Sequence, residues 1–491
     1  MHSKINPPFV FTNRYTAILL SCAVLLSLAL HWRIFSTDLM GPHVWRQTFT
    51  QNSIDAFYEE DNNITHLRVH ARGNEDGIHY QEFPLMQWTV AQVYSTIGNG
   101  ITVTRITCFL IGLIGWLGFC ALLRRLTKNK AVAVAGAVMF LFSPLFYYYM
   151  INPLPDLMAL AAACWSAALY YRAFNGENKR GYFLATAVLG IAVLCKLPYI
   201  VFAGIPLAMF VMHIRKKQKK GWAMLLISAL MFVPAVWWYA KALPHMLWNP
   251  VVSGVFSSAG TGTVWTALRD NVVSSLPELF LNYASVPFFI TGLVLLFKNK
   301  KLRAPHIAPL AVTGILTLLY FFYEIRLIST VHDYYMLPFL PLLFLIAARG
   351  WQWVTEQNTG WLKIAAIILV AVTPVTAFLR IDSRWNENDP GFEKDWLVHK
   401  EALRKAAPDD ALAIMGNDMT QCIVPYYVHK RGWTYVDSEL SAERLQTMIA
   451  QGARYLYTDS EYTLKDDTVR GLLGREVLVA GKVHVFELNP R

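Results

Sequence analysis

The chain has 491 residues, of which 55 % are hydrophobic and only 16 % are charged, and this balance is too apolar for an ordinary soluble enzyme. Because the apolar residues come in blocks of about 20, the length that crosses the hydrocarbon core of a bilayer, the sequence predicts a polytopic membrane protein. The net charge of +11 does not indicate nucleic-acid binding, because the basic excess lies in short connectors between apolar blocks.

Basic connectors set the expected topology. Lys and Arg cluster in residues 124–130, 172–180, 213–220 and 298–303, and the positive-inside rule places such connectors in the cytoplasm. The first apolar stretch has no convincing cleavage site, so we expect a retained anchor with a cytoplasmic N-terminus. The connectors between the basic ones, which carry the polar motifs described below, then face outward.

About eleven membrane-spanning helices are expected from the apolar blocks. They lie near residues 15–35, 101–123, 131–150, 155–172, 181–197, 198–212, 222–240, 278–297, 306–327, 334–349 and 361–380. The run from 181 to 212 contains Lys196 and Pro198. Proline removes a backbone donor and the charge needs a polar partner, so we expect a break there.

Two outward segments are long. The first, from about 36 to 100, holds eight acidic and three basic residues between Asp38 and Glu82, and ends in an amphipathic stretch suited to the membrane interface. The second runs from Lys241 to about Pro277. The aromatic residues in and beside it are expected in the headgroup belt: Trp238, Tyr239, Trp248 and Trp265.

Beyond residue 380 the composition becomes charged throughout. Short apolar runs at 411–415, 454–458 and 484–488 predict strands, and the segment from Ser441 to Gly452 has helical spacing. We therefore predict a transmembrane domain at residues 1–380 and a small extracytoplasmic α/β domain at residues 381–491.

The first outward segment begins with candidate catalytic residues. His43 and Arg46 follow the first span, and Asp55 lies further along an expected helix. A base and a fixed cation near acidic residues suit proton abstraction beside a phosphate. The alternative is that these residues only organise a water-exposed loop.

Asp156 and Lys196 are the ionisable residues that most need an explanation. Asp156 begins an apolar helix after two prolines, where it either caps the helix or serves as a base or ligand. Lys196 must reach a counter-ion, an aqueous cavity or, by snorkelling, the headgroups. Because His332 and Arg326 are expected at the same depth, we favour a shared anion site.

A divalent metal ion is a further alternative. Glu82, His245 and His332 are the candidate ligands, together with His43 and Asp333. No fixed ligand spacing supports this site. Apart from this metal ion, the sequence indicates no cofactor.

The order of the polar motifs resembles the GT-C superfamily of polyprenyl-phosphate-sugar-dependent glycosyltransferases, in the branch of the protein O-mannosyltransferases and the aminoarabinose transferases of lipid A. The motifs are HVWRQTFT at 43–50, YQEFPLMQW at 80–88, SPLFYYYMINPLPDLMAL at 143–160, LCKLPY at 194–199 and HDYYMLPFLP at 332–341. The resemblance covers residues 15 to about 350. It implies a GT-C-like helix bundle with an extracytoplasmic active site.

The resemblance also implies roles for particular residues. Glu82 and Asp156 match acidic positions of the family, and Lys196 matches a lysine in a similar apolar run. His43 and Val44 stand where many relatives have an Asp-Glu pair, and Phe83 stands where relatives often have Lys. The general base therefore stays open among His43, Asp55, Glu82 and Asp156, and the residues expected to bind the donor phosphate are Arg46, Lys196, His332 and Tyr335.

These observations favour an integral membrane glycosyltransferase, placed in a bacterial inner membrane. It would move a sugar from a polyprenyl-phosphate donor to a lipid, polysaccharide or protein acceptor on the outer face, with inversion at the anomeric carbon. One alternative is a transporter or lipid flippase that uses Asp156, Lys196 and His332 in substrate or proton relay. Another is a non-catalytic sensor that binds through its tail.

Overall fold

The computed structural model describes residues 14–176, 179–218, 220–247, 261–298, 306–330 and 332–489. The chain divides into two compact units. Unit 1 comprises Met1–Arg33, Gln81–Phe83 and Ile106–Ile381, and unit 2 comprises Ile34–Tyr80, Pro84–Arg105 and Asp382–Arg491. The first outward segment thus groups largely with the tail, and a division into domains at residue 381 stays a prediction.

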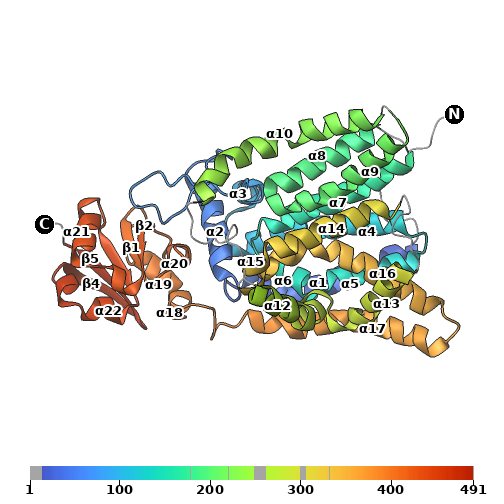
Figure 1. Ribbon diagram of the computed structural model, residues 1–491. Coiled ribbons are helices and arrows are strands. Elements are labelled where there is room, and N and C mark those ends of the chain that lie inside the picture. Colours follow the sequence, from blue (N-terminus) through green and yellow to red (C-terminus); the bar gives the residue numbers. More distant parts are fainter. Residues whose placement is uncertain are drawn as a thin grey trace. The chain divides into compact units, whose positions relative to one another are not determined.

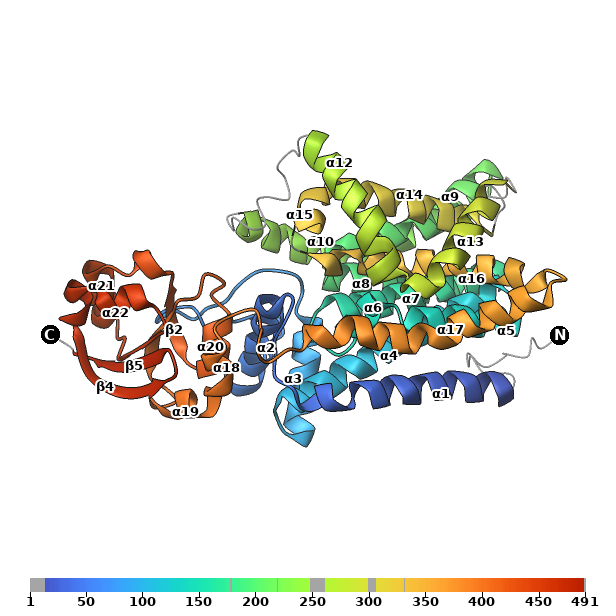
Figure 2. The ribbon, with the colours of Figure 1, turned by 90° about the horizontal axis from the view of Figure 1, so that it is seen from below.

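Unit 1 is a bundle of helices that run side by side (Figures 1 and 2). Its longer helices are α1 (Arg14–His31), α4 (Ile101–Leu126, from Ile106 on), α5 (Lys130–Leu141), α7 (Asp156–Gly176), α8 (Lys179–Cys195), α9 (Gly204–Arg215), α10 (Lys220–Leu247), α12 (Thr261–Asp270), α13 (Val286–Lys298), α14 (Ala308–Tyr323), α16 (Leu340–Glu356) and α17 (Gly360–Ile381). Shorter helical segments connect them: α6 (Pro144–Tyr149), η2 (Leu197–Ala203), η4 (Asn271–Phe280), η5 (Tyr283–Ser285), α15 (Ile325–Thr330) and η7 (Asp333–Phe339).

Within the described residues, six helical segments are long and apolar enough to cross a membrane, or seven if one bent pair counts as a single span. That pair is Gly262–Phe280 with Tyr283–Lys298, bent by 100°. Three shorter apolar helices accompany them: Lys130–Leu141, Arg180–Cys195 and Ala308–Tyr323. The prediction of a polytopic helical membrane protein is confirmed, whereas the number of eleven spans stays a prediction.

The expected break between two spans is confirmed at Lys196. Helix α8 ends at Cys195, Lys196 has extended backbone angles, and η2 begins at Leu197 with Pro198 as its second residue. Because proline has no N–H to continue the hydrogen-bond ladder of α8, the chain turns here. The turn leaves the lysine at a helix end.

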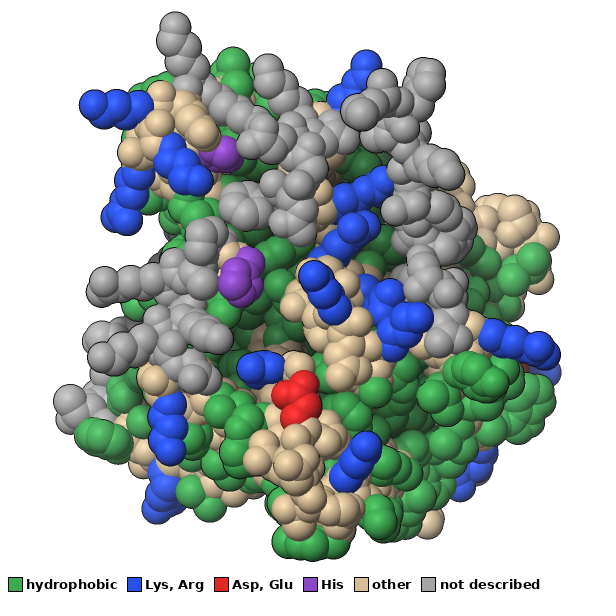
Figure 3. Space-filling view, turned by 90° about the vertical axis from the view of Figure 1, so that its right-hand side faces the viewer, with side chains coloured by type: hydrophobic (Ala, Val, Ile, Leu, Met, Phe, Trp, Pro, Cys, Tyr) green, Lys and Arg blue, Asp and Glu red, His purple; other side chains and the backbone are tan. Residues whose placement is uncertain are grey.

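Basic side chains gather at one end of unit 1. Helix α4 ends, and α5 begins, beside the exposed Arg125, Lys128 and Lys130, while α9 ends at the exposed Arg215 and Lys216. Figure 3 shows this end of the bundle with many Lys and Arg and few acidic side chains. Most of the fourth basic connector, 299–303, lies outside the described residues.

Small residues let several helices of the bundle approach closely. On α13 and α16, a Cβ added at Gly350 would lie 1.8 Å from the carbonyl oxygen of Phe288, and one added at Gly292 would lie 2.0 Å from that of Ile346. Close backbone approach through glycine is typical of helix pairs in membranes. These two glycines therefore fix how α13 packs on α16.

Unit 2 contains a five-stranded sheet in the order β2-β1-β3-β5-β4. The strands are β1 (Leu412–Gly416), β2 (Arg431–Tyr435), β3 (Tyr455–Thr458), β4 (Leu473–Ala480) and β5 (Val483–Leu488). β1 pairs in parallel with β2 and β3, while β5 is antiparallel to β3 and β4. Along β1 the side chains alternate between two cores, with Ala413 and Met415 in one and Ile414 in the other.

The predicted α/β tail is confirmed, with β1, β3 and β5 at the expected runs and helix α21 (Ala442–Ala450) capped by Ser441. The remaining helices of this part are α18 (Asp395–Val398), α19 (Lys400–Lys405), α20 (Ile423–Val428), α22 (Glu461–Lys465) and α23 (Asp467–Arg470). Strands β2 and β4 were not expected. β4 has several exposed side chains and β2 has Gly432 at a φ of 144°, so neither shows clear apolar alternation.

The first outward segment packs on the tail within unit 2. It forms helices α2 (Val44–Glu59) and α3 (Leu85–Ile97), the latter at the predicted amphipathic stretch. The Asn52 side chain donates to the carbonyl of Cys422 at 3.0 Å, and the Gly73 N–H donates to that of Gly432 at 2.7 Å. These contacts explain why the two segments form one unit.

The headgroup-belt prediction is wrong for two of its four aromatic residues. Helix α10 continues to Leu247, and Trp238 and Tyr239 are buried in unit 1 with exposures of 1 % and 6 %. The indole N–H of Trp238 donates to the carbonyl of Gln81 at 2.8 Å, which removes it from the membrane surface. Trp265 is exposed, and Trp248 lies outside the described residues.

Candidate functional site

Lys196 lies between two acidic side chains inside unit 1. Its Nζ is 3.3 Å from Oδ2 of Asp156 and 3.9 Å from Oε1 of Glu82. The side chains of Lys196, Asp156 and Glu82 are 11 %, 2 % and 8 % exposed. The lysine is therefore buried against carboxylates and does not snorkel to the headgroups.

The ends of two antiparallel helices bring Asp156 and Lys196 together. Asp156 is the first residue of α7, where the helix dipole favours a negative charge. Lys196 follows the last residue of α8, which packs along α7. The Tyr199 hydroxyl in η2 donates to the backbone carbonyl of Asp156 at 3.0 Å, so the turn after Lys196 is tied to the start of α7.

Glu82 is positioned by Trp238, a residue to which sequence reasoning gave no functional role. Besides the hydrogen bond from Trp238 to Gln81, the ring of Phe83 meets the Trp238 ring edge to face with centroids 5.0 Å apart. Both neighbours of Glu82 are thus held by one side chain of α10. Phe83, which stands where relatives often have lysine, has a packing role here.

Two tyrosine rings lie close to Lys196. The rings of Tyr334 and Tyr335 in η7 each lie 5.7 Å from its Nζ, a distance at which ring and cation attract. His332 stacks on Tyr335 with ring centroids 5.0 Å apart. The structure thus brings Glu82, Asp156, Lys196 and the motif beginning at His332 together from widely separated parts of the sequence.

Glu324 is a fifth ionisable residue at this place, and sequence reasoning missed it. It follows the last residue of α14, is 8 % exposed and has Lys196 as its electrostatic partner. Helix α14 packs on η2, which places its C-terminal end near the Lys196 turn. In the sequence, Glu324 could have been noticed as an acidic residue at the end of an apolar run, next to Arg326. The side chain of Arg326 lies outside the described part of the chain.

The residues Glu82, Asp156, Lys196, Glu324, His332, Tyr334 and Tyr335 are called the Lys196 cluster below. Helices α7 and α9 run from this region towards the basic connectors, and α8 and α14 run back from that end. The Lys196 cluster therefore lies at the end of unit 1 opposite the basic side chains. This arrangement agrees with the separation that the sequence predicted.

Comparisons with known proteins point to one fold. Residues 81–238 match the family model of dolichyl-phosphate-mannose-protein mannosyltransferases, a segment that includes Glu82, Asp156 and Lys196. No curated protein matches the chain. The structure of ArnT from Cupriavidus metallidurans in the apo state is similar with a TM-score of 0.68 at 13 % identity, covering 96 % of this chain and 97 % of that one.

Two further structures extend the similarity. ArnT from the same organism bound to undecaprenyl phosphate gives a TM-score of 0.64 at 14 % identity, with 97 % of this chain and 98 % of that one covered. The apo oligosaccharyltransferase of Archaeoglobus fulgidus gives 0.62 at 11 % identity, with 91 % and 70 % covered. The chain has the GT-C fold. The predicted resemblance to the GT-C superfamily is thereby confirmed.

Three predicted site residues lie in unit 2. His43 precedes α2 with a left-handed φ of 59°, Arg46 is buried with its guanidinium 5.2 Å from the Phe49 ring centre, and Asp55 accepts a hydrogen bond from Gln51 at 2.8 Å. Contact between these three residues and the Lys196 cluster stays a prediction.

Asp55 has an unusual proton affinity. Burial raises its pKa to about 6, an effect that the charge of His429 opposes and that of Glu59 reinforces. A carboxyl group with this pKa exchanges protons near neutral pH, as a general base must. Asp55 therefore stays among the candidates for proton transfer.

The candidate metal site of Glu82, His245 and His332 is not assembled. Among the described residues, no group of three or more His, Cys, Asp and Glu side chains could hold a metal ion. His245 is exposed in the last turn of α10, whereas His332 is buried with its ring stacked on Tyr335. The predicted ligands His245 and His332 therefore have different surroundings in the fold.

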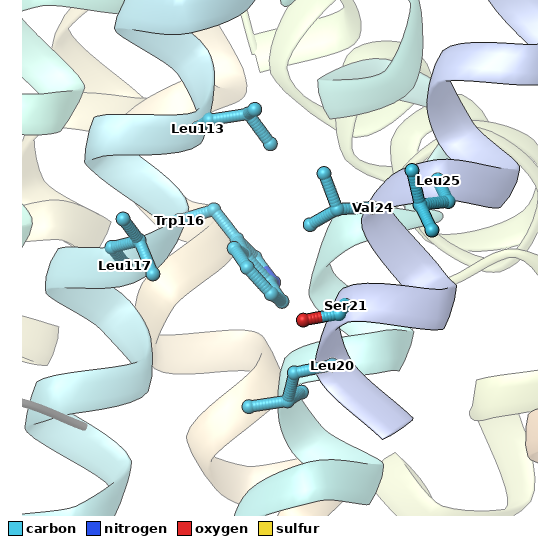
Figure 4. Close-up of a pocket in the computed structure, with 7 residues that line it drawn as sticks. All are labelled: Leu20, Ser21, Val24, Leu25, Leu113, Trp116 and Leu117. Atoms are coloured by element: carbon cyan, nitrogen blue, oxygen red, sulfur yellow. The ribbon is translucent and has the colours of Figure 1, made fainter. Parts of the chain in front are cut away.

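The GT-C bundle also has an apolar hollow of about 350 Å³ between α1 and α4 (Figure 4). Its lining residues are Leu20, Ser21, Val24, Leu25, Leu113, Trp116 and Leu117. All but Ser21 are apolar, and none belongs to the Lys196 cluster. Such a lining offers no acid, base or cation for catalysis.

Proposed function

We propose that this protein is a membrane glycosyltransferase that moves a sugar from a polyprenyl-phosphate donor to an acceptor on the outer face of the membrane. The buried ion pair of Lys196 with Asp156 is the observation that carries the proposal, because it places a cation beside carboxylates at the end of the bundle away from the basic connectors. The similarity to ArnT bound to undecaprenyl phosphate supports this class of donor.

Lys196 is the group that binds the donor phosphate. As the bond between the anomeric carbon and the phosphate oxygen breaks, negative charge grows on the phosphate, and a fixed cation in a buried site stabilises that charge. Tyr335 lies beside the lysine with His332 stacked on it, and the two rings complete this face of the donor site. Arg46 stays among the residues proposed to bind the donor phosphate.

Asp156 and Glu82 hold Lys196 in place before the donor binds. A buried ammonium group needs such partners, because its desolvation is otherwise too costly. The acceptor oxygen attacks the anomeric carbon on the side opposite the phosphate, which inverts the configuration there. The sequence motifs offer His43, Asp55, Glu82 and Asp156 as candidates for the base that takes the proton of the acceptor.

The proposed location is a bacterial inner membrane, with the N-terminus in the cytoplasm and the tail outside. The basic end of unit 1 supports this orientation through the positive-inside rule. The alternative of a transporter or flippase is less well supported, because transporters usually bind their substrates near the bilayer midplane. The Lys196 cluster lies instead where helices end.

Mass spectrometry of surface glycolipids and glycans tests the proposal in cells. Cells that lack the protein are compared with cells that carry the wild-type chain or Asp156→Asn. We expect one sugar modification to be present only with the wild-type chain. Identical glycan profiles in all three strains, with the protein present in the membrane, would contradict the proposal and would favour a sensor or transporter.

A further inference from the structure

Within the described residues, the Lys196 cluster contains three carboxyl groups, and Lys196 is the cation beside them. Glu82 and Asp156 lie within 4 Å of the Lys196 Nζ, and Glu324 is a third buried carboxyl group with the same lysine as its electrostatic partner. Among the described residues, further titratable groups near this place are His332 and the phenols of Tyr199, Tyr320, Tyr323, Tyr334 and Tyr335. If all three carboxyl groups are ionised, the Lys196 cluster carries a net negative charge, so a further negative charge on a phosphate there must be compensated.

Glu324 differs from the other two carboxyl groups in its surroundings. Asp156 and Glu82 pair directly with the ammonium group of Lys196, at 3.3 Å and 3.9 Å. In the part of the chain that the structure describes, Oε2 of Glu324 is buried and has no hydrogen-bond partner, as is also true of Oδ2 of Asp156, but the Asp156 oxygen lies 3.3 Å from the Lys196 ammonium group. A buried acceptor oxygen without a donor is costly in the resting protein and is satisfied when a donor arrives.

The neighbours of Glu324 favour the uptake of a proton by its carboxyl group. Its backbone N–H bonds back to Tyr320 and its carbonyl accepts from Leu327 and Ile328, so the backbone joining α14 to α15 is satisfied without the side chain. Tyr320, one turn earlier, has Glu324, Tyr335 and Asp156 as electrostatic neighbours. The carboxyl group therefore faces other acids and phenols, with Lys196 as its cation.

We propose that Glu324 is the proton acceptor of the transfer reaction that we propose for this chain. The acceptor hydroxyl gives its proton to Oε2 of Glu324 while its oxygen forms a bond to the anomeric carbon. The bond from that carbon to the phosphate oxygen breaks, and its electron pair stays on the phosphate. The donor phosphate changes from one negative charge to two as Glu324 changes from one to none.

This exchange keeps the charge of the site constant. Without it, a new negative charge would form among carboxylates in a buried place, where uncompensated charge is expensive. The lipid product meets the same constraint when it binds. A polyprenyl phosphate that enters the empty site brings its charge with it, so its binding is accompanied by the uptake of a proton at Glu324.

Undecaprenyl phosphate tests this inference without knowledge of the sugar. Its binding to the full chain in detergent is measured by calorimetry at about pH 8 in buffers of different ionisation enthalpy, which gives the number of protons taken up. We expect an uptake of about one proton for wild type and close to none for Glu324→Gln. Glu356→Gln, an exposed change on α16, is the matched control and should behave like wild type.

The outcomes separate the two proposals. Equal proton uptake by wild type and Glu324→Gln would overturn the role of Glu324 and leave the donor site intact. No binding of undecaprenyl phosphate to the wild type would overturn both. Should Glu324→Gln not fold, infrared difference spectra of the wild type replace it, since binding must create the carbonyl band of a protonated carboxyl group, and its absence overturns the inference.

Once a transferable sugar is found, the transferase activity of Glu324 variants provides a second test of the proposed role of Glu324. Glu324→Ala should lose at least about a hundredfold in turnover, in line with the usual contribution of a general base, and added formate should restore part of it. Glu324→Asp should keep measurable activity with a shifted pH profile. A variant without the carboxyl group that turns over like wild type would contradict the proposal.

Discussion

At the scale of single residues, the chemistry of this protein depends on how a buried lysine is balanced. Lys196 has Asp156 at 3.3 Å and Glu82 at 3.9 Å, and removing one partner of a buried ion pair usually costs about 3–5 kcal/mol. A loss of function in a single variant could therefore arise from instability alone. The cluster offers a way to separate the two effects.

Lys196→Met should lower both thermal stability and the affinity for undecaprenyl phosphate, the latter by at least about tenfold because a charge-assisted contact is lost. Lys196→Met combined with Asp156→Asn removes one of the two carboxylates left without their cation, so it should recover part of the stability but not lipid binding. Lys363→Met, on an exposed position of α17, is the control. Calorimetry and thermal unfolding of all four proteins measure these effects, and normal binding by the double variant would exclude Lys196 from the phosphate site.

Asp55 predicts a dependence of stability on pH. Its pKa is raised from 3.8 to about 6 by burial, so the folded state holds its proton more firmly than the unfolded state. The stability from this group is present below about pH 4 and is lost as the pH rises through about 6. Asp55→Asn should therefore gain thermal stability relative to wild type over this window, and a difference that stays constant from about pH 4 to about pH 7 would contradict the prediction.

The sequence identified most of the Lys196 cluster but not its complete membership. A lysine inside a long apolar run and an aspartate after two prolines are costly in a membrane, so their types and positions predict a shared polar site. Glu324 ends an apolar helix, where an acid is ordinary. Its burial depends on the packing of α14 on η2, which no local pattern encodes.

At the scale of elements, close contacts decide which helices pair. The α13–α16 pair depends on Gly292 and Gly350, where added Cβ atoms would overlap backbone atoms of the partner helix. Glycines in apolar runs are visible in the sequence, but the partner that each one meets is not. Strand β4 was also missed, because buried and exposed side chains do not alternate regularly along it.

Gly350→Ala should destabilise the bundle by roughly 1–3 kcal/mol, because overpacking forces the two backbones apart. The matched control is Gly314→Ala on α14, where nothing lies within 4 Å of the added Cβ. That change should be neutral or slightly stabilising, since alanine favours the helix. Thermal unfolding measures both, and equal effects of the two changes would contradict the packing described for α13 and α16.

Lys400 and Asp38 join the tail to the first outward segment in unit 2. The Lys400 ammonium donates to Asp38 at 2.5 Å, and Tyr426 donates to the same carboxylate. Burial acts to raise the pKa of Asp38, but the charge of Lys400 and these hydrogen bonds outweigh it and lower the pKa below its usual value. The ion pair therefore holds at neutral pH and weakens as the pH falls through this lowered pKa.

Lys400→Met should expose the connection between residue 38 and the tail to proteolysis at neutral pH, because it leaves Asp38 buried without its cation. Lys394→Met, outside this ion pair, is the control. Limited proteolysis followed by mass spectrometry locates the cleavage sites. Unchanged protection of both segments in Lys400→Met would show that the ion pair does not hold unit 2 together.

At the scale of the whole molecule, the sequence predicted the membrane class, the α/β tail and the separation of basic and polar ends within unit 1. These features follow from composition and from the positive-inside rule, which act over long stretches of chain. The grouping of residues 34–80 with the tail was beyond such reasoning. It rests on contacts such as that of Asp38 with Lys400, which are 362 positions apart.

Sugar transfer by the purified chain in liposomes, without any ion gradient, tests the central claim most directly. The liposomes contain polyprenyl-phosphate-linked sugars and a panel of lipid and peptide acceptors, and mass spectrometry detects the product. We predict covalent transfer by wild type and by Lys363→Met, and none by Asp156→Asn or Lys196→Met. Transfer that is undiminished in both of the latter variants, or gradient-driven flux of the lipid without any transfer by the wild type, would contradict this account.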